Sequence, residues 1–307
     1  MILKMIEIIS DFFIKRHDIT DLSHSRRIYG TVCSLSGIFL NLVLFVMKLT
    51  ASIFSGSVAA AVDAVHNLTD SASSCVTLIS FILSGKRKTK KYPMGLGRIE
   101  YVAGFIVSVV LISAGLELAK VSFTKIITPE PVTFSLPSVV MLSVSFFVKL
   151  YMAVYNRRIS RKISSAALSA ASTDCLCDSI ATLVATLALI FVEFTSFNTD
   201  AWGGLIVSLF ILFAGCKSAK DTIKMIIGQP VDEELNFLIK ERLEDFSSAV
   251  TVEEVAVHDY GPDSRILAVK IRFERNTDVQ IIDNLRMQIQ TLLAEKNKYE
   301  LLIIPVI

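Results

Sequence analysis

The sequence predicts an α-helical membrane protein with six transmembrane helices, followed by a small cytoplasmic α+β domain. Of its 307 residues, 52% are hydrophobic, and the apolar residues are concentrated before about residue 227. That asymmetry is typical of a membrane domain followed by a soluble tail. After Gly228 the long apolar stretches give way to short helical and alternating patterns. We therefore divide the chain into an N-terminal cytoplasmic segment (1–27), a transmembrane domain (28–226) and a cytoplasmic tail (227–307).

The N-terminal segment has the pattern of a surface helix. In residues 2–16, apolar residues recur near helical spacing, which indicates an amphipathic helix lying on the membrane. A partly ordered leader is the alternative. We do not expect a signal peptide, because Lys4, Glu7 and Asp11 interrupt the apolar stretch and no cleavage site follows.

Six apolar stretches follow, each longer than the roughly 20 residues that a helix needs to cross a bilayer. They are Ile28–Phe54, Val58–Leu83, Tyr101–Phe123, Leu136–Tyr155, Ser165–Phe191 and Ala201–Ile226.

The loops between these stretches differ in Lys and Arg content. Basic residues gather in the loop 86–98 and in residues 157–162, whereas the opposite loops 55–57 and 192–200 contain none and the opposite loop 120–137 contains two. By the positive-inside rule, both termini face the cytoplasm of a protein that spans the plasma membrane several times. The basic loop 86–98 is expected to contact anionic lipid headgroups, with repulsion of ions or domain pairing as the alternatives.

The tail alternates helical and strand patterns in the order αββαβ. A turn at residues 259–263 separates the first two strands, and Asp232 is suited to cap the first helix. The predicted elements are a helix at 232–246, strands at 251–258 and 265–273, a helix at 278–296 and a strand at 301–306.

Two motifs inside the apolar stretches carry the chemistry. His66 precedes Asp70 by four residues, and Asp174 precedes Asp178 by four, so each pair lies on one helical face. Carboxylates in a membrane span are costly and usually mark an ion or proton path. Three carboxylates and an imidazole are together suited to enclose a divalent cation.

Structural roles are the alternative for these carboxylates. An Asp within a span can pair with a buried Lys or form a hydrogen bond between helices. Lys48 and Lys149 are the nearest cations, but neither motif has one at matching depth in its own helix, and both lysines can instead snorkel to an interface. For Arg98 and Glu100, which flank the start of the third span, we expect a structural ion pair.

Three further residues are secondary candidates for the same site. Asp63 lies one turn before His66 and Asn67, where it either faces a water-filled approach or contacts Asn41 of the first span.

The five cysteines are expected to be small buried residues and not disulfides. The net charge of +2 gives no indication of nucleic-acid binding.

The chain resembles the cation diffusion facilitator family over essentially its whole length. His66, Asp70, Asp174 and Asp178 match the paired motifs of that family's transport site, which have His, Asp or Asn before xxxD on the second span and His or Asp before xxxD on the fifth. Further matching stretches are SGSVAAAVDAVHNLTDSASS (55–74), GLGRIEYVAG (95–104) and VHDYGP (257–262), the last two being most similar to a bacterial branch associated with manganese. The resemblance implies a ferredoxin-like tail that mediates homodimerisation.

Three departures from the family pattern qualify this resemblance. His66 stands where manganese-type members usually have Asn or Asp. The loop between spans two and three lacks the two His of a peripheral metal site. In the tail, only His258 remains from the usual zinc ligands, so we expect a dimer held by apolar packing.

The predicted function is efflux of a divalent metal, Mn²⁺ or Zn²⁺ with Fe²⁺ and Co²⁺ as further candidates, in exchange for protons by alternating access. We expect no permanently bound cofactor, because the metal is the substrate. The alternatives are a metal-selective channel and a membrane metal sensor. An enzyme is not expected, because an intramembrane metalloprotease would need a motif such as HExxH.

Overall fold

The structure is a computed structural model of the chain. It describes residues 22–55, 58–86, 88–128, 136–191, 199–228, 231, 233, 236–237, 239, 241, 250–262, 264–273, 287 and 300–306. The predicted surface helix at 2–16 lies outside these residues.

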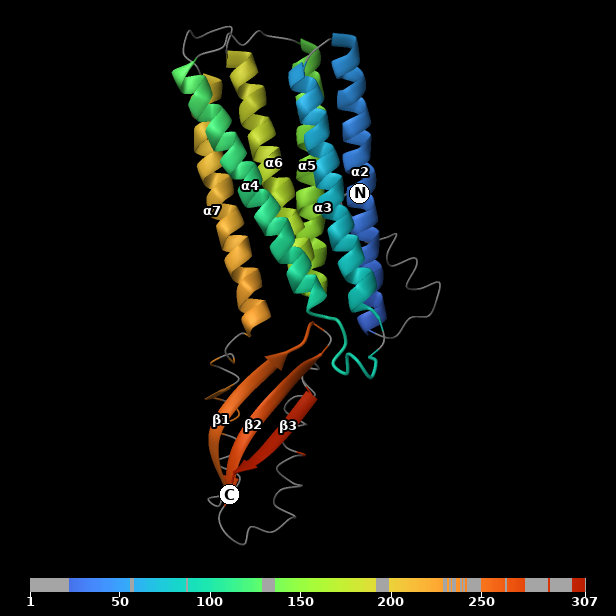
Figure 1. Ribbon diagram of the computed structural model, residues 1–307, viewed down its shortest axis with the longest axis vertical. Coiled ribbons are helices and arrows are strands. Elements are labelled where there is room, and N and C mark those ends of the chain that lie inside the picture. Colours follow the sequence, from blue (N-terminus) through green and yellow to red (C-terminus); the bar gives the residue numbers. More distant parts are fainter. Residues whose placement is uncertain are drawn as a thin grey trace. The chain divides into compact units, whose positions relative to one another are not determined.

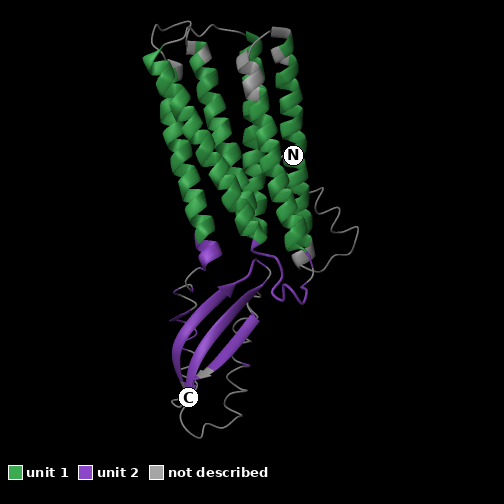
Figure 2. Ribbon diagram, viewed as in Figure 1, with its two compact units in different colours: residues 1–85, 99–223 green, residues 86–98, 224–307 purple. Residues whose placement is uncertain are grey.

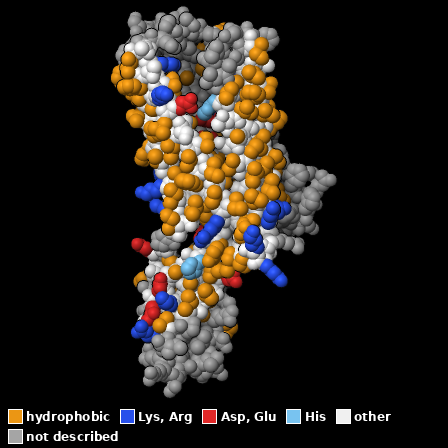
Figure 3. All heavy atoms as spheres, viewed as in Figure 1, with side chains coloured by type: hydrophobic (Ala, Val, Ile, Leu, Met, Phe, Trp, Pro, Cys, Tyr) orange, Lys and Arg blue, Asp and Glu red, His pale blue; other side chains and the backbone are white. Residues whose placement is uncertain are grey.

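Six long helices form the N-terminal part of the chain (Figure 1). They are α2 (Leu22–Ser55), α3 (Val58–Ser84), α4 (Ile99–Ile127), α5 (Leu136–Ile163), α6 (Ala166–Phe191) and α7 (Thr199–Ile227). Each contains one of the six apolar stretches almost entirely, which confirms the predicted helices. Apolar side chains cover most of the visible face of these helices (Figure 3).

Five of the six helices are long and apolar enough to cross a membrane: α2, α4, α5, α6 and α7. The described part of α3 does not reach that apolarity, because polar residues such as His66, Asn67 and Asp70 interrupt it. The crossing of α3 therefore stays a prediction, while a helical membrane domain is confirmed.

The described residues divide into two compact units (Figure 2). The first contains residues 1–85 and 99–223, and the second contains residues 86–98 and 224–307. The basic loop 86–98 therefore packs with the tail, although it lies between α3 and α4 in sequence. Our predicted boundary at residue 227 falls close to the start of the second segment of this unit.

The helical unit has two apolar cores. The larger joins α2, α3, α5 and α6, and α5 and α6 pack along each other. The smaller lies between α4, α6 and α7. The first core includes Tyr29, Phe81, Met152, Tyr155, Ile159 and Leu168, and the second includes Leu111, Cys177, Val207 and Ile211.

A buried ion pair ties one end of the helical unit together. The Arg26 guanidinium of α2 donates hydrogen bonds to both carboxylate oxygens of Glu100 on α4, at 2.6 and 2.8 Å, and to the Ile163 carbonyl at the end of α5, at 2.7 Å. Glu100 thus has the structural ion pair expected of it, with Arg26 as its partner. Arg98 instead contacts the tail, so the acid pairs with a cation that is distant in sequence.

The tail forms a three-stranded sheet from β1 (Val250–Asp259), β2 (Arg265–Phe273) and β3 (Glu300–Val306). β1 pairs antiparallel with β2, and β2 pairs parallel with β3. A parallel pair requires a crossover connection, which leaves room for the helix predicted at 278–296. Met287, the one described residue of that range, is helical, as are the described residues of 232–246. The strands are confirmed, and the ferredoxin-like arrangement stays a prediction.

The basic loop joins this unit through a close backbone contact. Arg98 donates a 2.7 Å hydrogen bond from Nε to the Asp259 carbonyl, and its guanidinium lies 4.8 Å from the centre of the Tyr260 ring. A Cβ at Gly97 would lie 2.7 Å from the Tyr260 carbonyl oxygen and 2.9 Å from the Gly261 Cα. Only glycine therefore fits at position 97.

Candidate metal centre

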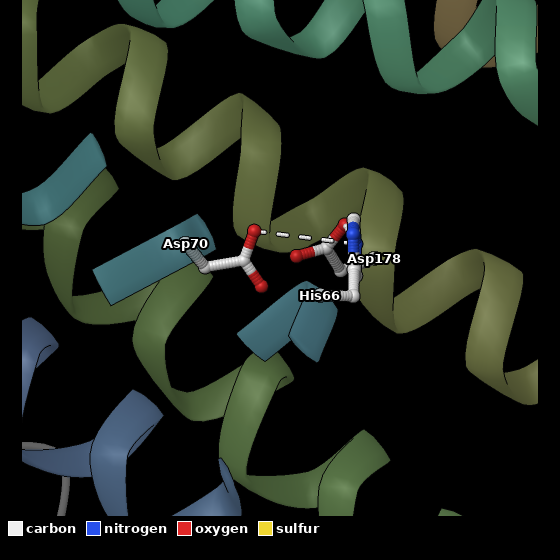
Figure 4. A group of neighbouring side chains, drawn as sticks. All are labelled: His66, Asp70 and Asp178. Carbon is white, nitrogen blue, oxygen red and sulfur yellow. Dashed lines mark ion pairs between the residues drawn. The ribbon is translucent and has the colours of Figure 1, made fainter. Parts of the chain in front are cut away.

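Three of the four motif residues meet in the helical unit. The carboxylates of Asp70 and Asp178 point toward each other and toward the His66 imidazole, with Asp178 on α6 and the other two on α3 (Figure 4). His66 Nε2 lies 3.6 Å from Asp178 Oδ1 and 4.0 Å from Asp70 Oδ1. The three residues can offer ligand atoms that all lie within 4.8 Å of one another.

Local helix geometry and the packing of α3 near α6 produce this cluster. The spacing of four places His66 and Asp70 on one face of α3, and this face meets Asp178 of α6. The three side chains differ in exposure: His66 is 45% exposed, Asp178 13% and Asp70 5%. The imidazole therefore forms the accessible side of the cluster, and the carboxylates form its interior.

This donor set fits a divalent transition metal. One imidazole nitrogen with carboxylate oxygens suits Zn²⁺ and accepts Mn²⁺, Fe²⁺ or Co²⁺. In a tetrahedral site with bonds of about 2.1 Å, neighbouring ligand atoms are about 3.4 Å apart. The nitrogen–oxygen separations of 3.6 and 4.0 Å are wider, and the three ligand atoms all lie within 4.8 Å of one another. The carboxylates would therefore have to move inward for all three donors to reach one ion.

Asp174 is not part of this cluster. It lies one turn before Asp178 on α6, and it is buried at 8% exposure. However, the group of ligand atoms within 4.8 Å contains only His66, Asp70 and Asp178 among the described residues. Its role as a fourth ligand stays a prediction.

The secondary candidates are also untested. Asn41 on α2 and Asn67 on α3 are both buried at 1% exposure. Asp63 lies on α3, but its side chain is outside the described residues. Cys33, Cys175 and Cys177 are buried, but Cys75 is half-buried and Cys216 is exposed, so the expectation that all five cysteines are buried was wrong for these two.

Lys149 of α5, one of the two lysines considered as structural partners of these carboxylates, enters the cluster. Its Nζ donates hydrogen bonds to Asp70 Oδ2 at 2.6 Å and to Asp178 Oδ2 at 2.8 Å. The side chain is 3% exposed, so it does not snorkel to an interface. The structure thus contains the buried Lys partner that was one alternative for these carboxylates. Lys149 binds their Oδ2 atoms, next to the Oδ1 atoms that face His66. The only sequence signal was a lysine in the middle of an apolar stretch.

In the tail, acidic residues pair with basic neighbours in the sheet. Glu254 on β1 pairs with Lys270 on β2, and Glu253 pairs with Arg272. His258 is an exposed residue of β1 opposite Ile266. The two ion pairs are ordinary cross-strand contacts between β1 and β2.

Comparison with known proteins establishes the family. Residues 34–227 match the family described as the cation efflux transmembrane domain, and this match covers more than half of the chain. The protein belongs to that family, which confirms the resemblance to cation diffusion facilitators. Its members are transporters, so the expectation that the chain is not an enzyme is also confirmed.

Several curated proteins are similar over shorter stretches. Magnetosome protein MamM of Paramagnetospirillum magneticum is 36% identical over 86 residues, or 27% of each chain. A probable cation efflux system protein of Mycobacterium tuberculosis H37Rv is 41% identical over 78 residues, covering 23% of this chain and 24% of its own. Mitochondrial metal transporter 1 of Saccharomyces cerevisiae is 31% identical over 104 residues, covering 34% and 20%. The chain thus matches only about a quarter of the length of these relatives.

Proposed function

We propose that this protein is a divalent transition-metal efflux transporter of the plasma membrane. The observation that carries the proposal is the cluster of His66, Asp70 and Asp178 from two helices of the membrane unit. Membership of the cation efflux family supports it, as does the similarity to proteins named as a metal transporter and a cation efflux system protein. The substrates are Mn²⁺ or Zn²⁺, with Fe²⁺ and Co²⁺ also accepted by this donor set.

Transport proceeds by alternating access around the cluster, in exchange for protons. Carboxylate and imidazole ligands bind metal only when deprotonated, so metal entry releases protons and proton entry displaces metal. Asp174 approaches as the fourth ligand in the metal-bound state. The protein acts as a homodimer with both termini in the cytoplasm.

Uptake into proteoliposomes tests this function. The purified chain should move Mn²⁺ or Zn²⁺ at a rate that saturates with metal and rises with an imposed pH gradient. Asp178→Asn should abolish this movement, while Cys216→Ser, an exposed substitution on α7, should leave it unchanged. A transport rate that does not depend on the pH gradient and far exceeds that of a carrier would favour a channel. If the intact protein moves no metal at all, a sensor would be favoured.

A further inference from the structure

Lys149 places a positive charge inside the candidate metal centre. Its Nζ lies 2.6 Å from Asp70 Oδ2 and 2.8 Å from Asp178 Oδ2, so one ammonium joins carboxylates from two other helices. The Lys149 side chain is 3% exposed. With so little access to water, its charge is compensated by these two carboxylates, which also supply the proposed metal site.

The carboxylate oxygens are divided between Lys149 and His66. Both Oδ2 atoms accept hydrogen bonds from Lys149, and both Oδ1 atoms face His66 Nε2. A metal bound to His66 and the Oδ1 atoms would therefore share both carboxylate groups with the ammonium. Two cations this close repel each other strongly in a poorly solvated site, where the effective dielectric constant is low.

We propose that Lys149 is a tethered competitor for the metal. Without metal, its ammonium supplies part of the positive charge that the carboxylates of Asp70 and Asp178 require. Metal binding must weaken or break its two hydrogen bonds, and their return favours release of the ion. The proposal rests on the proposed function, and it assigns to Lys149 the task of keeping metal binding weak enough for transport.

The consequence distinguishes a competitor from a residue that merely holds the carboxylates in place. If Lys149 only positions Asp70 and Asp178, removing its charge lets the carboxylates move apart, and metal binds more weakly. If Lys149 competes, the same change leaves the metal as the sole compensating cation, and metal binds more tightly. The two roles predict opposite signs for one measurement.

The experiment compares metal binding by full-length variants in detergent micelles, using calorimetric titration with Mn²⁺ and, separately, Zn²⁺. Lys149→Gln removes the charge but keeps a hydrogen-bond donor, and Lys149→Met removes both. Both should lower the dissociation constant at least tenfold. Lys149→Arg retains the charge and should stay within about threefold of the original protein. Lys120→Gln, at an exposed position of α4, is the matched control and should change nothing.

Unchanged or weaker binding by Lys149→Gln and Lys149→Met overturns the proposal. If these variants unfold without metal, Mn²⁺ or Zn²⁺ present throughout purification should restore a monodisperse protein, because the ion replaces the lost charge. Failure of both ions to do so also overturns it. Failure of the proposed function gives a different result: the original protein then binds no metal, or binds it equally well after His66→Ala.

Discussion

The ion pair between Arg26 and Glu100 makes a strong prediction about stability. Glu100 is fully buried, and the Arg26 side chain is 9% exposed. Both carboxylate oxygens accept from the same guanidinium, which also binds the Ile163 carbonyl. One cation therefore joins the ends of α2, α4 and α5, and removing the Glu100 charge breaks a buried ion pair from one side.

We expect Glu100→Gln to cost about 3 kcal/mol of unfolding free energy, the lower end of the range for breaking a buried pair. The lower end applies because an amide oxygen still accepts one hydrogen bond and the bond to Ile163 persists. This cost corresponds to a roughly 150-fold fall in the ratio of folded to unfolded protein. The double variant Arg26→Met/Glu100→Met removes both charges and should cost less than Glu100→Gln alone.

Denaturant-induced unfolding in detergent micelles measures these differences. Arg27→Met is the matched control, because neighbouring Arg27 donates a 3.2 Å hydrogen bond to the Gly85 carbonyl at an exposed site, with no buried partner among the described residues. We expect that control to stay within about 0.5 kcal/mol of the original protein. A loss below about 1 kcal/mol in Glu100→Gln, or a double variant less stable than the single one, would refute the reasoning.

Two further predictions concern the metal centre. His66→Asn replaces a nitrogen donor by an oxygen donor and should shift the transport preference from Zn²⁺ toward Mn²⁺. Competitive uptake into proteoliposomes measures this preference, and an unchanged ratio of Zn²⁺ to Mn²⁺ uptake would exclude His66 as a ligand. Asp174→Asn should weaken metal binding at least tenfold in calorimetric titration if Asp174 joins the bound ion, whereas Cys175→Ser, its buried neighbour, should not. Equal affinity for both variants would restrict the site to the three clustered residues.

The helices were predictable because a bilayer imposes one simple requirement on sequence. A span needs roughly 20 apolar residues, and loops interrupt that pattern visibly. The predicted stretch Ser165–Phe191 accordingly differs from α6 by one residue. The tail strands were predictable for a similar reason, since Leu267, Val269 and Ile271 of β2 alternate and are buried in the sheet core.

Contacts between helices were less predictable, because helical periodicity sets a residue's face but not its partner. The spacing of His66 and Asp70 followed from one helix, whereas their meeting with Asp178 rested on the chemistry of the two motifs and on the family resemblance, and not on periodicity. Lys149 lies 79 residues from Asp70, and no local pattern connects them. Glu100 similarly pairs with Arg26, 74 residues away, although Arg98 is its neighbour in sequence.

The contact between the loop 86–98 and the tail allows a last prediction. Gly97 and Gly261 approach so closely that a Cβ at Gly97 would lie within 3 Å of the backbone of Tyr260 and Gly261. Gly97→Ala should therefore push the loop away from the turn. The contact should lose the 1–3 kcal/mol of stability that is typical of overpacking, so it should open roughly 5- to 150-fold more often.

Hydrogen–deuterium exchange measures this opening at the turn that the loop covers. There the Gly261 amide donates to Asp259 Oδ1 at 2.8 Å, and the Tyr260 amide donates to the Ser264 carbonyl at 2.9 Å. Both amides should exchange at least about fivefold faster in Gly97→Ala. Leu96→Ala, which removes side-chain atoms from the adjacent position, is the control. Its Tyr260 and Gly261 amides should exchange at rates closer to those of the original protein than the same amides of Gly97→Ala. An unchanged exchange rate of these amides in Gly97→Ala would mean that the turn keeps its conformation without the loop. The stretches GLGRIEYVAG and VHDYGP, which resemble the family, would then not stabilise each other.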